Sequence, residues 1–246
     1  MAIQSLLYKK SYKINDSINI IIPTVGEILD NQEMYYGLVS MLTAMPVDMM
    51  VQLDDIGIDF TTINEYDLFL IMFAGANFQK DAKGKKIDTS LIFGDLDLSK
   101  FRVAENEQNG NLILLDTEND IKIDRAIHGR IADFLRQIHH LEKNIRKPAN
   151  EDGKKFMLER ARAKLKRRKR QNEDSQLESL IVAMVNTEQY KYDFEGTREL
   201  SIYQFNESVR QVIKKVDYDN KMYGVYTGSI NAKDLSQDDL NWLSHK

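Results

Sequence analysis

Residues 152–172 read DGKKFMLERARAKLKRRKRQN, and no other part of the chain has this character. Eight of the eleven residues from 160 to 170 are lysine or arginine. Met157, Ala161 and Leu165 recur every four residues, so a basic helix over 152–172 would carry one narrow apolar stripe. Such a stripe can dock on a core, whereas the remaining faces of the helix must meet water or an acidic surface.

This stretch separates two regions with different hydrophobic patterns. Residues 1–123 mix short β-branched runs with helical spacing, and residues 124–246 show helical spacing only. We therefore predict an α+β fold that is mostly helical, with a small antiparallel β-ribbon or sheet near residues 90–123. The predicted organisation is a mixed α/β N-terminal region over 1–123 and an all-helical C-terminal region over 124–246 that includes the basic helix.

The composition is that of an ordinary globular protein. The chain has 246 residues, of which 42% are hydrophobic and 29% charged, so it can bury a substantial core. It contains no cysteine, which excludes disulfides, thiolate metal sites and a cysteine nucleophile. It shows neither the apolar run of a signal peptide nor the roughly 18 apolar residues of a membrane span. We expect a soluble protein with no membrane partner.

The net charge of −4 conceals a polarised molecule. Residues 154–170 contain ten basic residues and one acidic residue, Glu159, so this segment carries +9 and the rest of the chain −13. A basic helix on an acidic body can associate head to tail, or can present one face to nucleic acid and another to protein.

The N-terminal region is predicted to begin with a strand and to continue with helices. Residues 17–23 form a β-branched run that ends at a proline, which is typical of a short strand. Thr24 and Glu27 have the spacing of a capping box at the start of the next helix. Pro46 is expected to begin another helix, and Asn64 to cap a third that is apolar on all sides and therefore buried.

Beyond residue 90 the hydrophobic period shifts toward two. The runs at 91–93, 101–104, 112–115 and 121–123 predict four short strands. The dipeptide Asn109-Gly110 lies between the second and third runs and is a strong hairpin signal.

The C-terminal region predicts a succession of amphipathic helices. The first begins at Asp124 and extends over five turns with an inward face formed by Ile127, Ile131, Phe134, Leu135, Ile138, Leu141 and Ile145. A helix is predicted after the basic stretch, where the apolar residues recur at i, i+3, i+4, i+7 and i+8: Leu177, Leu180, Ile181, Met184 and Val185. Ser201 is expected to cap a helix whose inward residues are Ile202, Phe205, Val209, Val212, Ile213 and Val216. Ser236 and Asp239 would open a last helix carrying Leu240, Trp242 and Leu243.

The cations of the basic helix are the first candidate interaction site: Arg160, Arg162, Lys164, Lys166, Arg167, Arg168, Lys169 and Arg170. Lysine and arginine neutralise phosphates, and counterion release favours nucleic-acid binding. However, no recognised nucleic-acid-binding motif accompanies the helix, and no aromatic residue falls between 160 and 170 to stack on bases. A solvated or protein-facing helix is the simpler interpretation, and nucleic acid is the alternative partner.

Aromatic residues form the second candidate site. Eight of them lie between residues 190 and 226, and protein interfaces favour tyrosine and tryptophan. Helical cores also use aromatic side chains, so we expect at least half of the eight to be buried. The possible interface residues are Tyr190, Tyr192, Tyr223 and Tyr226, with Trp242 near the C-terminus.

Histidines and acidic residues do not predict a metal site. His139 and His140 diverge by about 100° on a helix, and His128 is too far along it to share a metal, so we expect structural histidines at the surface. The acidic clusters Asp95/Asp97 and Asp116/Glu118/Asp120 lack the glycine and glutamate of an EF-hand loop. We expect them to face solvent at strand ends.

Signatures of catalysis are also missing. The sequence contains no GxxxxGK[ST], GxGxxG or GxSxG motif. We therefore expect no enzymatic activity, no catalytic residue, no metal and no cofactor.

Residues 175–243 carry a family resemblance. They read SQLESLIVAMVNTEQYKYDFEGTRELSIYQFNESVRQVIKKVDYDNKMYGVYTGSINAKDLSQDDLNWL. This resembles the C-terminal part of a group of tailed-bacteriophage proteins, in which a helix ending in NTE precedes a tyrosine-rich turn and an IYQFN helix. A YDNKMYGVYTG segment and a terminal LNWL follow. The helix from 124 to 145 and the charged helix before residue 175 fit the same layout, so the resemblance covers roughly the second half of the chain.

The resemblance implies a role among phage structural proteins, in the tail or baseplate, and brings no catalytic residues. Gly224 and Gly228 bracket the segment YGVYTG, where backbone turns are expected. The first hypothesis is thus a non-enzymatic phage structural or assembly protein. It would be located in the virion, assembled in the host cytoplasm, and bound to other phage structural proteins in a multi-subunit assembly. The alternatives are a tail assembly chaperone absent from the mature virion, or a nucleic-acid-binding protein that uses the basic helix.

Overall fold

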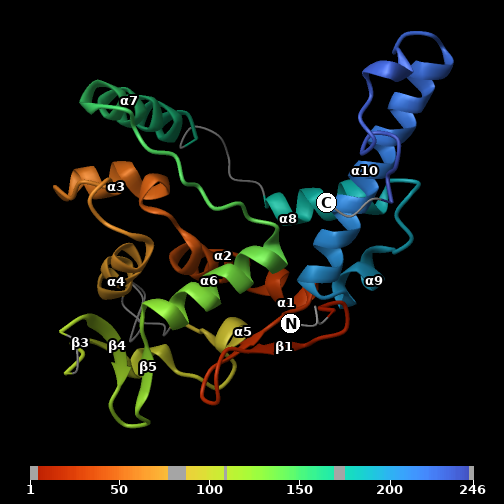
Figure 1. Cartoon of the computed structure of the whole chain (residues 1–246). Helices are drawn as coiled ribbons and strands as arrows, with labels where there is room; N and C mark the ends of the chain where they lie inside the picture. The colour runs from red at the N-terminus through yellow and green to blue at the C-terminus, as the bar shows by residue number, and fades with distance from the viewer. Residues whose placement is uncertain (1–4, 77–86, 108–109, 169–174, 244–246) are drawn as a thin grey trace.

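The computed structural model describes residues 5–76, 87–107, 110–168 and 175–243 (Figure 1). Its strands are β1 (Ser11–Lys13), β2 (Asn19–Ile21), β3 (Arg102–Glu105), β4 (Leu112–Asp116) and β5 (Ile121–Ile123). Its α-helices are α1 (Val25–Asp30), α2 (Gln32–Thr43), α3 (Met50–Asp55), α4 (Glu65–Gly75), α5 (Ser90–Phe93), α6 (Arg125–His139), α7 (Glu151–Arg168), α8 (Gln176–Val185), α9 (Phe194–Glu199) and α10 (Ile202–Tyr226). The predicted α+β, mostly helical class is confirmed.

The predicted helix starts are confirmed by their caps. The Thr24 hydroxyl accepts from the backbone N–H of Glu27 at 3.2 Å, and the Glu27 carboxylate accepts from the N–H of Thr24 at 2.7 Å. Asn64 forms the same reciprocal pair with Asp67 at the start of α4. Pro46 begins a 3₁₀ turn, Pro46–Met49, that leads into α3. Each cap satisfies backbone donors that have no partner within the helix.

Two small antiparallel sheets are present. Strands β1 and β2 form a hairpin, and β3, β4 and β5 form a three-stranded sheet in sequence order. Glu105 pairs with Leu112, which confirms the predicted hairpin; Asn109 lies outside the described residues, and Gly110 has a φ of +69°. Strand β1 was not predicted, because SYK lacks an alternating apolar pattern.

The strand predicted at residues 91–93 is wrong, because this segment forms the single helical turn α5. Adjacent residues Ile92 and Phe93 are both buried, which a helical turn permits and an alternating strand does not. The N–H of Gly94 closes the turn by donating to the carbonyl of Ser90 at 2.8 Å, with Gly94 at a φ of +59°.

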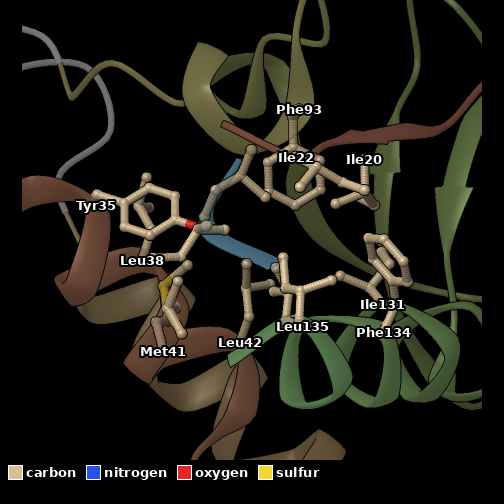
Figure 2. Packing of buried hydrophobic residues seen from close by; sticks show 14 of the residues in the cluster. Ile20, Ile22, Tyr35, Leu38, Met41, Leu42, Phe93, Ile131, Phe134 and Leu135 are labelled. Atoms are coloured by element: carbon tan, nitrogen blue, oxygen red, sulfur yellow. The ribbon is translucent and has the colours of Figure 1, made fainter. Parts of the chain in front are cut away.

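Helix α6 lies at the centre of the main core. It packs against α2, α4, β5 and α10, and Figure 2 shows its side chains facing those of β2 and α2. Ile131 and Leu135 are fully buried, and Phe134 stacks on Tyr12 of β1 with ring centroids 4.4 Å apart. The face predicted from Ile127 to Ile138 is therefore the main apolar face of the molecule.

The prediction that this face continues through Leu141 to Ile145 is wrong. Helix α6 ends at His139, and His140 takes a left-handed conformation with φ 52° and ψ 38°. The N–H of Leu141 then donates to the carbonyl of Arg136 at 2.9 Å, which terminates the helix as in a Schellman motif. Leu141 is consequently 44% exposed and Ile145 74% exposed.

The C-terminal helices are anchored on the N-terminal part of the chain. The N–H of Val25 donates to the carbonyl of Leu200, and the N–H of Ile202 donates to the carbonyl of Pro23, both at 2.8 Å. Ile202 and Phe205 are buried in the main core beside this contact. The first two turns of α10 are thus fixed on the body.

Beyond these turns α10 projects away from the body (Figure 1). The prediction that Ile213 and Val216 point inward is therefore wrong, since they are 62% and 37% exposed. The prediction of a last helix beginning at Ser236 is also wrong. Ser236 and Asp239 exchange the expected cap hydrogen bonds at 2.9 and 3.2 Å, but within residues 235–243 only a turn follows them.

The position of the α6 C-terminus can be tested with two equivalent substitutions. Leu135→Ala should lower the free energy of unfolding by about 2–5 kcal/mol, because it leaves a cavity in the core. Leu141→Ala should change it by no more than about 0.5 kcal/mol, because that side chain lies beyond the helix end. Urea unfolding followed by circular dichroism measures both. Equal losses would show that Leu141 is in the core, as the sequence pattern alone suggests.

Candidate interaction surfaces

One face of α7 rests on α3 and the loop after it. The stripe of Met157, Ala161 and Leu165 is half-buried, and Met157 packs with Leu158 against the small cluster that contains Leu53 and Phe60. The predicted apolar stripe is therefore confirmed as the side of the helix that docks.

Ion pairs reinforce this contact. Lys154 Nζ lies 2.5 Å from a carboxylate oxygen of Asp59, and one guanidinium nitrogen of Arg162 lies 2.7 Å from Asp54 and 2.6 Å from Asp55. The hydrogen bond from Lys154 is the main reason that the pKa of Asp59 is lowered to about 2. Arg162 is therefore occupied within the molecule, although the sequence places it in the candidate binding set.

The opposite side of α7 presents cations to solvent. Arg160, Lys164 and Arg167 are exposed, and their spacing of four and three residues places them on one face. Lys166 is exposed on a neighbouring side of the helix. None of these four cations forms a salt bridge with a residue that the structure describes.

The remaining predicted cations cannot be placed on a surface. Arg168 is the last residue of α7, and its side chain lies outside the described part of the structure. Lys169 and Arg170 lie outside the described residues altogether.

Phe156 is a surface residue that the sequence reasoning missed. Its side chain is 62% exposed, and it precedes Arg160 by four residues, so it lies on the same face as Arg160, Lys164 and Arg167. The i, i+4 spacing to Arg160 was the available signal. An exposed aromatic ring beside cations can stack on a base or an aromatic side chain.

The distal part of α10 and residues 227–243 form a second surface, which we call the C-terminal arm. After α10 the chain returns along the helix (Figure 1). Lys221 Nζ lies 2.6 Å from Asp239 and 2.5 Å from Asp217. Lys215 Nζ lies 5.7 Å from the ring centroid of Trp242, within the range of a cation–π contact. These contacts hold the returning segment on one side of α10.

The two glycines of this arm have different roles. Gly228 has a φ of +75° in the turn that ends α10, as predicted. Gly224 instead lies inside α10, where a Cβ atom would be 2.6 Å from Cδ1 of Ile230. It is a position of close packing, and the prediction of a backbone turn there is wrong.

The candidate aromatic residues occupy different environments. Tyr190 is buried, where its hydroxyl is 3.1 Å from that of Thr197. Trp242 is half-buried against the arm. The exposed members are Tyr192, Tyr223 and Tyr226, at 45%, 72% and 86%.

Exposed apolar side chains lie along α10. Ile213, Val216 and Tyr223 share one side of the helix with Asn220, following i, i+3, i+7 and i+10 spacing. The ion pairs Lys215–Asp219 and Asp217–Lys221, both at 2.5 Å, lie beside this row. An apolar strip with a charged border has the anatomy of a protein–protein contact.

The histidines are not all at the surface, and that expectation is wrong. His128 is 2% exposed and stacks on Phe69 with ring centroids 4.3 Å apart. His139 is half-buried, and its Nε2 lies 2.8 Å from the Tyr35 hydroxyl. Burial lowers the pKa of both imidazoles to about 4, so both are neutral at physiological pH.

The acidic clusters form turns. The Asp97 carboxylate accepts from the N–H of Ser99 at 3.0 Å. Asp116 is 1% exposed, so the expectation that it faces solvent is wrong; it accepts from the N–H of Glu118 at 3.0 Å and from the Asn119 amide at 2.6 Å. Within the described ranges, no group of three or more histidines and carboxylates is arranged to hold a metal ion.

The close approach of Ile230 to Gly224 gives a test of the arm. Gly224→Ala should displace the returning segment and speed amide hydrogen exchange in residues 229–243, because the new methyl group overlaps Ile230. Overpacking of this kind typically costs about 1–3 kcal/mol. Adding Ile230→Ala should remove the overlap and slow the exchange again relative to Gly224→Ala. Unchanged exchange in the single Gly224→Ala variant would contradict the packing.

The C-terminal arm lies in the part of the chain that is similar to a known domain. Residues 168–246, about a third of the chain, match the family model of the YomV second domain, a phage-derived family of the SPbeta prophage type. No curated protein and no solved structure matches the chain. Among the described residues, none of the helices has both the length and the apolar character needed to cross a bilayer. The domain match supports a phage origin for this protein.

Proposed function

We propose that this chain is a non-enzymatic structural or assembly protein of a tailed phage. It acts in the tail or baseplate through contacts with other phage structural proteins. The observation that carries the proposal is the C-terminal arm, which lies within the region that matches the phage-derived family model, projects from the body and carries exposed apolar and aromatic side chains.

The chemistry of the arm suits a protein partner. Tyr223 and Tyr226 offer large, mostly exposed rings, and tyrosines are frequent among the residues that dominate binding energy. The arm is also held in place before it binds. Its anchors at Asp239 and Trp242 limit the ordering that association would otherwise require.

The outward face of α7 offers a second contact of opposite character. Its cations would meet acidic surfaces of neighbouring subunits, because the chain outside residues 154–170 carries a net negative charge. Complementary potentials of this kind accelerate association and fix orientation. The apolar arm and the cationic helix would thus engage different subunits in an assembly.

Quantitative mass spectrometry of purified particles, with the lysate of infected cells for comparison, tests the location. We expect retention in particles at a defined copy number, because a structural subunit occupies symmetry-related positions. Abundance in lysate with absence from particles would instead identify a tail assembly chaperone. Absence from both would contradict any phage role.

The contribution of the arm can be tested by single substitutions. Tyr223→Asp and Tyr226→Asp should each reduce incorporation into particles at least tenfold, or about 1.4 kcal/mol, because each places a charge in the proposed contact. The matched control is Tyr8→Asp, since Tyr8 is 90% exposed on another part of the molecule. Thermal unfolding should be unchanged in all three variants. An equal loss with Tyr8→Asp would argue against a contact through the arm.

Nucleic-acid binding by α7 is a second candidate, favoured by Phe156 beside the three outward cations. If the protein acts as a structural subunit, we expect it to bind DNA only weakly and non-specifically, with a dissociation constant of about 10⁻⁴–10⁻⁶ M at physiological salt. Combined reversal of Arg160, Lys164 and Arg167 to Glu should then impair incorporation and barely alter DNA affinity. Reversal of the dispersed cations Lys10, Arg130 and Lys191, which lie outside both α7 and the C-terminal arm, is the matched control.

The nucleic-acid alternative makes the opposite prediction. DNA affinity would be high, would fall steeply with salt, and would be lost on reversal of the α7 face but not in the control. Phe156→Ala would weaken it further, because stacking on a base is worth about 1–3 kcal/mol. Fluorescence anisotropy with single-stranded and double-stranded DNA across a salt series separates the two cases.

A further inference from the structure

A cleft of about 670 Å³ opens between the Pro46 turn, residues 60–65 and the segment that joins α6 to α7. Volumes of this size are typical of ligand-binding pockets. Its apolar lining includes Met45, Val47, Phe60, Ile63 and Ile145. Ile145 is 74% exposed, so a large aliphatic side chain at the cleft lacks a close-packed partner.

The Glu65 carboxylate in the cleft is already paired with two cations. The side chain of Glu65 is 14% exposed, and its two carboxylate oxygens lie 2.5 Å from Arg136 and 2.5 Å from Lys143. Burial alone would raise the pKa of Glu65, but the hydrogen bonds from Lys143 and Arg136 outweigh it and lower the pKa. Glu65 therefore remains ionised and paired, and adds no net negative charge to the cleft.

The rim of the cleft is positively charged. Arg146 and Lys147 are both exposed lining residues, and neither forms a salt bridge with a described residue. Lys154 also lines the cleft but is paired with Asp59, and Glu151 is the one lining carboxylate other than Glu65. A ligand that enters the cleft would therefore meet Arg146 and Lys147 at its rim, where neither cation has a carboxylate partner among the described residues.

The segment beside the cleft has unpaired backbone groups. Within the described residues, positions 142–149 neither donate nor accept any backbone–backbone hydrogen bond; the Arg146 N–H donates to the side-chain oxygen of Asn144 at 3.4 Å, and Pro148 has no N–H. The segment has no regular secondary structure, and most of its residues are exposed. Exposed backbone of this kind can pair with an added peptide strand.

We propose that this cleft binds an extended peptide segment of a partner protein, in which an apolar residue is flanked by acidic ones. The apolar side chain enters the cleft beside Phe60 and Ile145. The acidic residues meet Arg146 and Lys147, and the peptide backbone pairs with residues 142–149. The inference goes beyond the proposed phage role and does not depend on it.

A peptide satisfies the three features of the site together. An apolar small molecule would leave the backbone groups and the rim cations unused. A free phosphate or nucleotide would find its cations on the exposed rim, because Lys143, which also lines the cleft, is paired with Glu65. The acidic peptide contributes charge, an apolar side chain and a hydrogen-bonding backbone at once.

Fluorescence anisotropy on the full chain, at about 0.15 M ionic strength, tests the proposal. The probe is a labelled octapeptide with adjacent leucine and phenylalanine between aspartates. We expect saturable binding of this probe and none of a version with lysine in place of aspartate. N-methylation of alternate peptide nitrogens should weaken binding at least tenfold, because it removes the donors that pair with residues 142–149.

The rim variant Arg146→Glu with Lys147→Glu should also weaken binding at least tenfold. Its matched control is Lys10→Glu with Arg130→Glu, which makes the same charge change outside both the cleft and α7 and should alter affinity less than twofold. All four residues are exposed, and thermal unfolding verifies that both variants fold.

Three results would overturn the proposal: no saturable binding of the acidic peptide, equal weakening by the rim variant and its control, or undiminished binding after N-methylation. None of these would affect the particle composition measured for the proposed phage role, so the two conclusions fail independently.

Discussion

Burial of the apolar face of α6 is the interaction on which the rest of the structure depends. Ile131, Leu135 and Ile138 are fully buried where α6 meets α2, α4, β5 and α10. Each such side chain contributes about 1.5–3 kcal/mol relative to exposure. The hydrophobic core contains residues from both sides of residue 124, although the chain changes its hydrophobic pattern there. The division at residue 124 therefore describes the hydrophobic pattern along the sequence, while the residues on its two sides share one core.

The candidate surfaces are formed by segments that do not pack on the core around α6. Because its helix ends at His139, the next residues reach α7 without regular secondary structure and border the cleft. Because only the start of α10 packs on the core, its distal part projects with exposed apolar side chains. The three surfaces proposed for partners therefore lie outside the main core. Substitutions there can change binding with little effect on the stability of the fold.

Some of the cations are also used inside the molecule and are not available to a partner. Arg136 is 6% exposed on the buried side of α6, and it is tolerated there because Glu65 and the carbonyl of Thr43 accept its hydrogen bonds. On α7, Arg162 is similarly engaged in ion pairs with Asp54 and Asp55. The number of cations in a sequence segment therefore overstates the charge available to a partner.

The sequence by itself determined the helix caps, the three-stranded sheet and the docking stripe of α7, because these depend on local hydrogen bonds and short-range periodicity. Only the tertiary structure decided which apolar residues are buried. Leu135 and Leu141 fit the same helical pattern, yet a left-handed residue at His140 separates a core position from an exposed one. Phe156 and the cleft were likewise decided by tertiary structure, because exposure and concavity depend on which elements meet in space.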